Sequence, residues 1–113
     1  MDQTYLLTIL ILLAGVSMTG LGYPLWKQMI PPNIWYGFRT RRTRSDPTLW
    51  YAVNRLLGKD MMIAGAVTTT VAAVILLLGA HLSPIVGTAI LAAVLLVSVI
   101  LMTIRGARYL YKN

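Results

Sequence analysis

Few side chains in this sequence are able to perform acid–base or metal chemistry. Asp2, Asp46 and Asp60 are the only carboxylates, and His81 is the single histidine. The absence of cysteine excludes disulfides, thiolate metal ligands and cysteine nucleophiles. A carboxylate or histidine site would therefore have to use these four residues.

Basic side chains, by contrast, are concentrated in one stretch of the chain. Segment 31–59 is the only long polar segment, and seven of the ten Lys and Arg residues lie in it or just before it. Such a cluster recognises anions: nucleic-acid phosphates, anionic lipid head groups or acidic protein surfaces. The seven residues are Lys27, Arg39, Arg41, Arg42, Arg44, Arg55 and Lys59.

The rest of the chain is apolar enough to be a membrane protein. Of its 113 residues 58% are hydrophobic and only 12% are charged, about half the ~25% charged residues of soluble domains. A membrane-spanning helix needs about 20 apolar residues, and three runs are that long. We therefore predict an all-α integral membrane protein of one domain, with three transmembrane helices. Their predicted bounds are 5–26, 61–82 and 85–104, with a loop at 27–60 and a tail at 105–113.

The distribution of charge predicts how the helices are oriented. The loop and the tail hold all ten Lys and Arg residues, whereas the N-terminus and the turn at His81 hold none. By the positive-inside rule, the loop and tail are cytoplasmic and the N-terminus is outside. This topology separates Asp2 and His81 from Asp46 and Asp60, so neither a Ser-His-Asp triad nor a mixed metal site can form at the loop. We expect no catalytic residues, no metal site, no cofactor and no enzyme activity.

The net charge of +7 is better explained by orientation and by anionic lipid than by nucleic acid. A loop tethered to the membrane at both ends has little freedom to wrap a nucleic-acid strand. The predicted spans hold no ionisable group at membrane depth, since His81 lies at the outer edge, and this disfavours transport by this chain alone. An anionic lipid or an acidic protein is the expected partner.

The polar loop divides into two parts by its helix signals. Pro31 and Pro32 cannot continue a helix, so the first part, through Arg44, is expected to be extended or turned. Gly37 supplies a position where the backbone can take a positive φ.

The second part of the loop carries the signals of a short helix. Asp46 is a good N-cap, Pro47 suits the first helical position and Gly58 suits the stop. We predict an amphipathic helix from Pro47 to Leu57, lying in the head-group layer. Asp60 would then sit beside Lys59 at the N-terminus of the next helix, where negative charge is favourable. The apolar stripe of the short helix comprises Leu49, Trp50, Val53, Leu56 and Leu57.

Small residues recur every four positions in the second and third spans. Such spacing allows close helix contact in lipid, although small residues are also common in spanning helices for no such reason. The residues are Gly65, Thr69 and Ala73, and Ala89 and Ala93.

The polar loop resembles the signature of the SdpI family, from PPNIWYGFRTRRT through Trp50 to NRLLGK. The resemblance covers about residues 26–104. Its ordered combination of residues is specific, whereas no single piece of it is. The matching residues are Pro32, Asn33, Gly37, Arg39, Thr40, Thr43, Trp50 and Gly58, with Asn54 and Arg55 in the NRLLGK stretch.

The resemblance implies a protein of the bacterial cytoplasmic membrane that gives immunity to a secreted, membrane-active peptide toxin. It also implies signalling, in which the toxin-occupied protein retains a transcriptional repressor at the membrane. The founding immunity protein has further spans before this module, whereas here one span precedes it. The alternatives are an accessory membrane subunit that forms homo-oligomers, and a transporter or channel formed only as an oligomer.

Within the signature we distinguish two roles. Asn33 and Thr40 are expected to tie the turn by side-chain bonds to the backbone, with Trp50 packed over it, forming a structural clasp that includes Gly37. Arg39 fits either role. The residues expected to contact lipid or an acidic partner are Arg41, Arg42 and Arg44.

Overall fold

The chain folds into long helices joined at one end by a structured loop. The computed structural model describes residues 3–78 and 84–112, and within them no strand occurs. Three of the helices are long and apolar enough to cross a membrane, so the predicted all-α membrane class is confirmed. The helices are α1 (Gln3–Trp26), α2 (Arg41–Ser45), α3 (Pro47–Leu77) and α4 (Pro84–Lys112).

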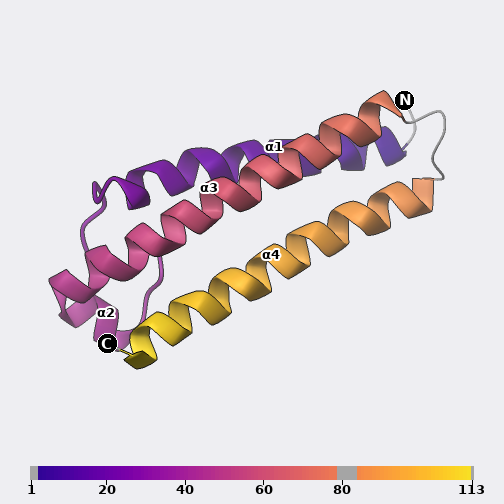
Figure 1. Cartoon of the computed structure of the whole chain (residues 1–113). Coiled ribbons are helices and arrows are strands. Elements are labelled where there is room, and N and C mark those ends of the chain that lie inside the picture. The colour runs from indigo at the N-terminus through magenta and orange to yellow at the C-terminus, as the bar shows by residue number, and fades with distance from the viewer. Residues whose placement is uncertain (1–2, 79–83, 113) are drawn as a thin grey trace.

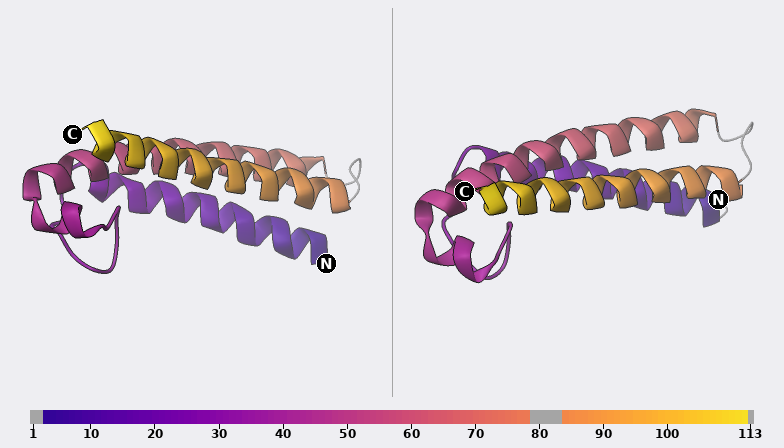
Figure 2. Two further views of the ribbon diagram at one scale, coloured as in Figure 1. Left: turned by 90° about the horizontal axis from the view of Figure 1, so that it is seen from below. Right: turned by 60° about the horizontal axis from the view of Figure 1, so that its bottom comes forward.

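The three long helices form an elongated bundle with α3 in contact with both others. Figures 1 and 2 show α1 running antiparallel along one side of α3, and α4 running along another. The connection between α1 and α3, the short helix α2 and the end of α4 all lie at one end of the bundle, opposite the start of α1. The bundle is 51 Å long, whereas the hydrocarbon layer is about 30 Å thick. It is thus long enough for its ends to extend beyond the hydrocarbon.

Four glycines bring α1 and α3 into backbone contact. Gly15 faces Gly65 and Gly22 faces Gly58, so each helix supplies two glycines seven residues, or about two turns, apart. A Cβ on Gly22 would lie 2.6 Å from the Gly58 carbonyl oxygen, and one on Gly15 would lie 3.0 Å from that of Gly65. Any side chain here would force the helices apart. We call these four glycines the glycine seam.

Helix α3 begins as predicted but does not end where predicted. The side chain of Asp46 accepts a hydrogen bond from the Leu49 N–H, and Pro47 occupies the first turn. The helix then continues through Gly58 to Leu77. Gly58 is therefore a contact position in the seam, not a helix stop, and Asp60 lies inside the helix instead of at its N-terminus.

The prediction of a separate interfacial helix is therefore wrong. Leu49, Trp50 and Val53, from its predicted apolar stripe, are buried in the protein, so they do not face a lipid layer. These side chains are buried because the preceding loop folds back over the start of α3 (Figure 2). The stripe was recognisable from the sequence, but the surface that covers it was not.

The remaining differences concern segment ends. Residues 41–44, expected to be extended or turned, lie in the one-turn helix α2. Helix α4 runs through the predicted tail to Lys112. The turn predicted at His81 and the predicted end of the second span fall in residues 79–83, outside the described part of the chain, as does Asp2.

Candidate functional site

The first turn of the polar loop is built around one asparagine. The Asn33 side chain donates from Nδ2 to the Pro31 carbonyl at 2.8 Å. Its Oδ1 accepts from the backbone N–H groups of Trp35 and Tyr36, both at 2.8 Å. The predicted side-chain-to-backbone bonding of Asn33 is present, and it orders the segment that follows the two prolines.

Two threonines start the short helix α2. The Thr40 hydroxyl accepts from the Thr43 N–H at 3.1 Å, and the Thr43 hydroxyl accepts from the Thr40 N–H at 2.7 Å. This reciprocal arrangement is a capping box, here made by two threonines. The buried Thr43 hydroxyl also bonds to the Phe38 carbonyl at 3.0 Å. The Thr40–Thr43 spacing could have predicted the start of α2. It was overlooked because the preceding prolines favoured an extended or turned segment.

Trp50 and Asn54 of α3 hold the middle of the loop. Trp50 is 0% exposed and donates from Nε1 to the Ile30 carbonyl at 2.8 Å. Asn54 accepts from the Phe38 N–H at 2.5 Å and donates to the Trp50 carbonyl at 3.0 Å. Gly37 passes directly over this pair with φ +113°, where a Cβ would lie 2.6 Å from Asn54 Oδ1. Both the left-handed backbone and the lack of space require glycine.

The same loop bonds to α1. The hydroxyl of Tyr36 donates to the backbone carbonyl of Leu21, in the last two turns of that helix. Partial burial raises the pKa of the Tyr36 hydroxyl above its usual value of 10.0. The phenol therefore stays protonated, and able to donate this bond, at any physiological pH.

The loop also reaches α4. The Phe38 ring lies against Gly106, where a Cβ would be 2.5 Å from the nearest ring carbon. Arg42 donates from Nη1 to the Leu110 carbonyl at 2.5 Å, in the last turn of α4. A cation is favourable there because the helix dipole is negative at its C-terminus. Arg42 was predicted to contact lipid or a partner, whereas this bond gives it a place within the fold.

Residues 30–54 thus connect all three long helices, and we call this segment with its contacts the clasp. The polar side chains of the signature are used internally: amide and hydroxyl groups of Asn33, Thr40, Thr43 and Asn54 bond within the segment. Pro32 precedes the Asn33 turn, and Gly58 lies outside the clasp, in the glycine seam.

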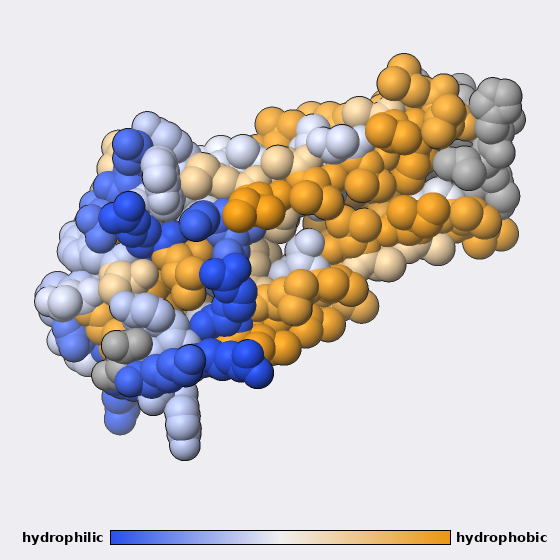
Figure 3. Space-filling model, viewed as in Figure 1, coloured by the Kyte–Doolittle hydropathy of each residue, from blue (hydrophilic) through white to orange (hydrophobic). Residues whose placement is uncertain are grey.

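The arginines of the clasp, and Arg55 directly after it, differ in what they contact. Arg39 donates to the Ile34 carbonyl at 2.5 Å, and the Arg55 guanidinium lies 6.0 Å from the centre of the Trp26 ring. Arg41 and Arg44 are exposed, and within the described part of the chain neither forms an ion pair. We call Arg41 and Arg44 the basic face; they lie in α2, at the end of the bundle where hydrophilic residues gather in Figure 3.

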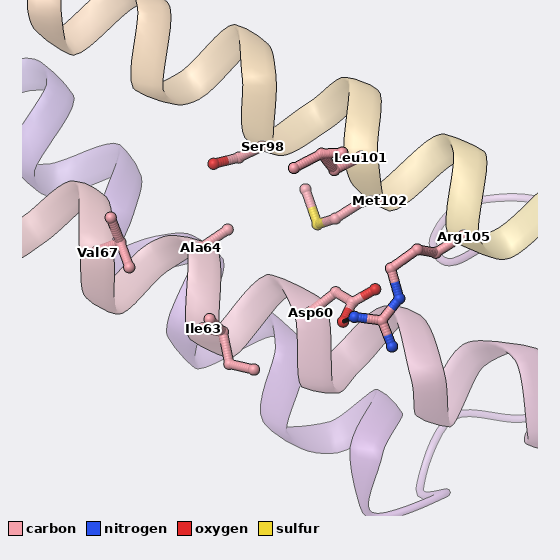
Figure 4. Close-up of a pocket in the computed structure, with 8 residues that line it drawn as sticks. All are labelled: Asp60, Ile63, Ala64, Val67, Ser98, Leu101, Met102 and Arg105. Carbon is pink, nitrogen blue, oxygen red and sulfur yellow. Dashed lines mark ion pairs between the residues drawn. The ribbon is translucent and has the colours of Figure 1, made fainter.

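An ion pair joins α3 to α4 beside the clasp. Arg105 Nη1 lies 2.9 Å from Asp60 Oδ1, with Arg105 54% exposed and Asp60 only 7% exposed (Figure 4). This pair was not predicted, because Asp60 was assigned to a helix start. The sequence does carry a signal for this pair: opposite charges stand at the loop ends of the second and third apolar runs.

The described carboxylates cannot act together. Asp46 caps α3 and Asp60 pairs with α4, and the 14 residues between them on one helix amount to about 21 Å. Among residues 3–78 and 84–112, no group of three His, Asp or Glu side chains lies close enough to hold a metal ion.

Comparison with known proteins identifies a family. The model of the SdpI/YfhL protein family matches residues 29–104, which include the clasp, the rest of α3 and most of α4. No curated protein and no solved structure matches the chain.

Proposed function

Because the chain belongs to the SdpI/YfhL family, we propose that it is a non-catalytic immunity and signalling protein of the bacterial cytoplasmic membrane. Its target is a membrane-active peptide toxin. In this proposal the clasp and the end of α4 are cytoplasmic and the N-terminus is outside, as the charge distribution predicts.

One observation carries the signalling part of the proposal. The polar signature side chains are used to fold the clasp, whereas the adjacent Arg41 and Arg44 face outward without an ion pair in the described structure. A rigid segment that presents two arginines on one short helix is a suitable surface for carboxylates on a partner. The partner implied by the family is a transcriptional repressor, held at the membrane when toxin occupies the bundle. Anionic lipid is the alternative occupant.

The immunity part is tested by survival. Toxin-sensitive bacteria that express this protein should survive a dose of sporulation-delaying toxin that kills cells carrying an empty vector. A Trp50→Ala variant, in which the clasp is unpacked, should lose protection, whereas Trp35→Ala should keep it because that side chain is 81% exposed. Equal killing of wild-type and empty-vector cells would overturn immunity.

The signalling part needs a separate measurement. The Arg41→Gln/Arg44→Gln double variant should keep survival while losing membrane retention of the repressor. A matched double variant, Arg108→Gln/Lys112→Gln, removes the same charge from α4 and should retain the repressor. If both double variants lose retention equally, general attraction to anionic lipid explains the basic face.

A second function is favoured by the outward surface of α4. Ala89 and Ala93 are exposed and four residues apart, as small residues are in helix–helix contacts between membrane proteins. They would allow a second copy to pack there, as expected for an accessory subunit. Cysteine cross-linking at Ala93 in native membranes should then give dimers, and a purely monomeric result would exclude this contact.

A further inference from the structure

A crevice opens between α3 and α4 next to the clasp. Its volume is about 240 Å³, equal to roughly eight water molecules at their liquid volume of about 30 Å³ each. Asp60 and Arg105 form its polar end (Figure 4). The walls are mainly apolar, with one hydroxyl from Ser98; the apolar residues are Ile63, Ala64, Val67, Leu101 and Met102. The crevice thus combines a charged pair with a surface suited to hydrocarbon.

The buried carboxylate at this polar end lacks one hydrogen bond. Asp60 Oδ1 receives Arg105, but Oδ2 is buried with no donor among the described residues. Leaving a buried charged acceptor unsatisfied is less favourable than pairing it. A ligand with an N–H donor, particularly a cationic one, would supply the missing bond.

The arginine beside it has donors to spare. The planar guanidinium carries five N–H groups, and the ion pair uses Nη1, while the side chain is 54% exposed. The remaining N–H groups fit the oxygens of a phosphate. The Asp60 carboxylate can therefore bind a cationic group, and the neighbouring Arg105 can bind an anionic one. Together they complement a zwitterion.

The depth of this pair in the bundle matches a lipid head group. The 17 residues from Asp60 to Leu77 at the far end of α3 span about 26 Å, close to the ~30 Å of the hydrocarbon layer. The apolar walls extend from the pair in that direction, since Ala64 and Val67 follow Asp60 along α3.

We propose that this crevice binds one membrane phospholipid whose head group carries a primary ammonium, as in phosphatidylethanolamine. The ammonium donates to Asp60 Oδ2, the phosphate accepts from Arg105, and an acyl chain lies along the walls of α3 and α4. A choline head group has no N–H to donate to the carboxylate. A glycerol head group brings no cation, so its phosphate adds net negative charge beside Asp60.

The wild-type protein alone tests the proposal. Native mass spectrometry of the protein in detergent should compare phosphatidylethanolamine with its N-methyl, N,N-dimethyl and choline forms, with identical chains. The head groups offer three, two, one and no N–H donors. Because one N–H is enough for the bond to Asp60 Oδ2, affinity should fall mainly at the last step, by about tenfold between the first and last lipids for one lost bond to a charged acceptor. Equal affinity for the first and last lipids would overturn the proposal.

Two variants separate the two contacts. Asp60→Asn keeps the size of the side chain but removes its charge, so the affinity series should become flat while binding of the choline lipid persists. Arg105→Gln should weaken all four lipids alike, and Arg108→Gln, one turn along α4 and outside the crevice, should change none of them. A series that keeps its slope in Asp60→Asn, in a variant with unchanged elution and helicity, would contradict the assigned role of the carboxylate.

Discussion

The two sides of α3 solve the problem of helix packing differently. Towards α1, the glycine seam brings backbones together so closely that no side chain fits between them. Towards α4, a crevice of about 240 Å³ remains, and the Asp60–Arg105 pair joins the two helices beside it. In lipid no hydrophobic effect drives helices together, so close van der Waals packing has to stabilise their association.

This difference implies that α1, α3 and the clasp form the stable part of the protein, with α4 attached more weakly. Besides the ion pair, α4 is held near its end by the clasp, through Phe38 against Gly106 and Arg42 at Leu110. Towards the other end of the bundle, Leu91 of α4 is fully buried with Ala72 and Ile75 of α3, so α4 is packed there by side chains, whereas α1 meets α3 through the backbone. We expect α4 to separate first on unfolding, and the variants below test that order.

The largest effect is expected where the clasp is packed most tightly. Trp50→Ala removes a fully buried ring and its bond to the Ile30 carbonyl, which should cost about 3–5 kcal/mol of unfolding free energy. Trp35→Ala, in the same clasp but at a side chain that is 81% exposed, should change it by less than about 0.5 kcal/mol. Denaturation in mixed micelles, followed by tryptophan fluorescence and circular dichroism, measures both. Similar losses would show that the clasp is not a packed unit.

A smaller but still large effect is expected in the glycine seam. Gly65→Ala would place a Cβ 2.7 Å from the Thr19 backbone nitrogen, and because backbone cannot rotate away, we expect a loss of about 2–3 kcal/mol. Gly20→Ala on α1 meets nothing within 4 Å and should raise helix stability by about 0.5–1 kcal/mol. The same unfolding assay decides, and a neutral Gly65→Ala would mean that α1 and α3 are not held in backbone contact.

The sequence predicts the features of this fold that depend on neighbouring residues. Three apolar runs of sufficient length predict the long helices, and Asp46-Pro47 predicts the start of α3. The positive φ of Gly37 and the bonds of Asn33 were likewise predicted, because such turns are stabilised within a few residues.

Features that depend on distant residues were not predicted. Gly58 has the local signature of a helix stop, but contact with Gly22, 36 residues earlier, makes it part of a continuous helix. The Arg42–Leu110 and Asp60–Arg105 contacts join residues 68 and 45 positions apart. Of the seam only Gly65 lay in the small-residue pattern, and Ala89 and Ala93 from that pattern are exposed. Periodicity identifies candidate faces of a helix but not which neighbour each face meets.

The ion pair offers a direct measure of how strongly α4 is attached. Asp60→Asn, Arg105→Gln and the double variant form a thermodynamic cycle in which we expect a coupling of about 1 kcal/mol. The estimate is small because Arg105 is half exposed and water screens the pair. A spin label on α4 should also show increased mobility in each single variant. If the losses of unfolding free energy in the two single variants simply add in the double variant, the ion pair does not help to attach α4. The clasp would then hold it.

The smallest expected effect separates two neighbouring arginines of α2. Arg42→Ala removes a cation from the negative end of the α4 dipole and should cost about 0.5–1 kcal/mol, mainly by freeing the last turn of α4. Arg44→Ala, at an exposed residue of the same helix, should fall within about 0.5 kcal/mol of the wild type. Amide hydrogen exchange around Leu110 should rise only in Arg42→Ala. If both variants protect Leu110 equally, α4 is not fastened by the clasp through Arg42, and Arg42 belongs with the basic face.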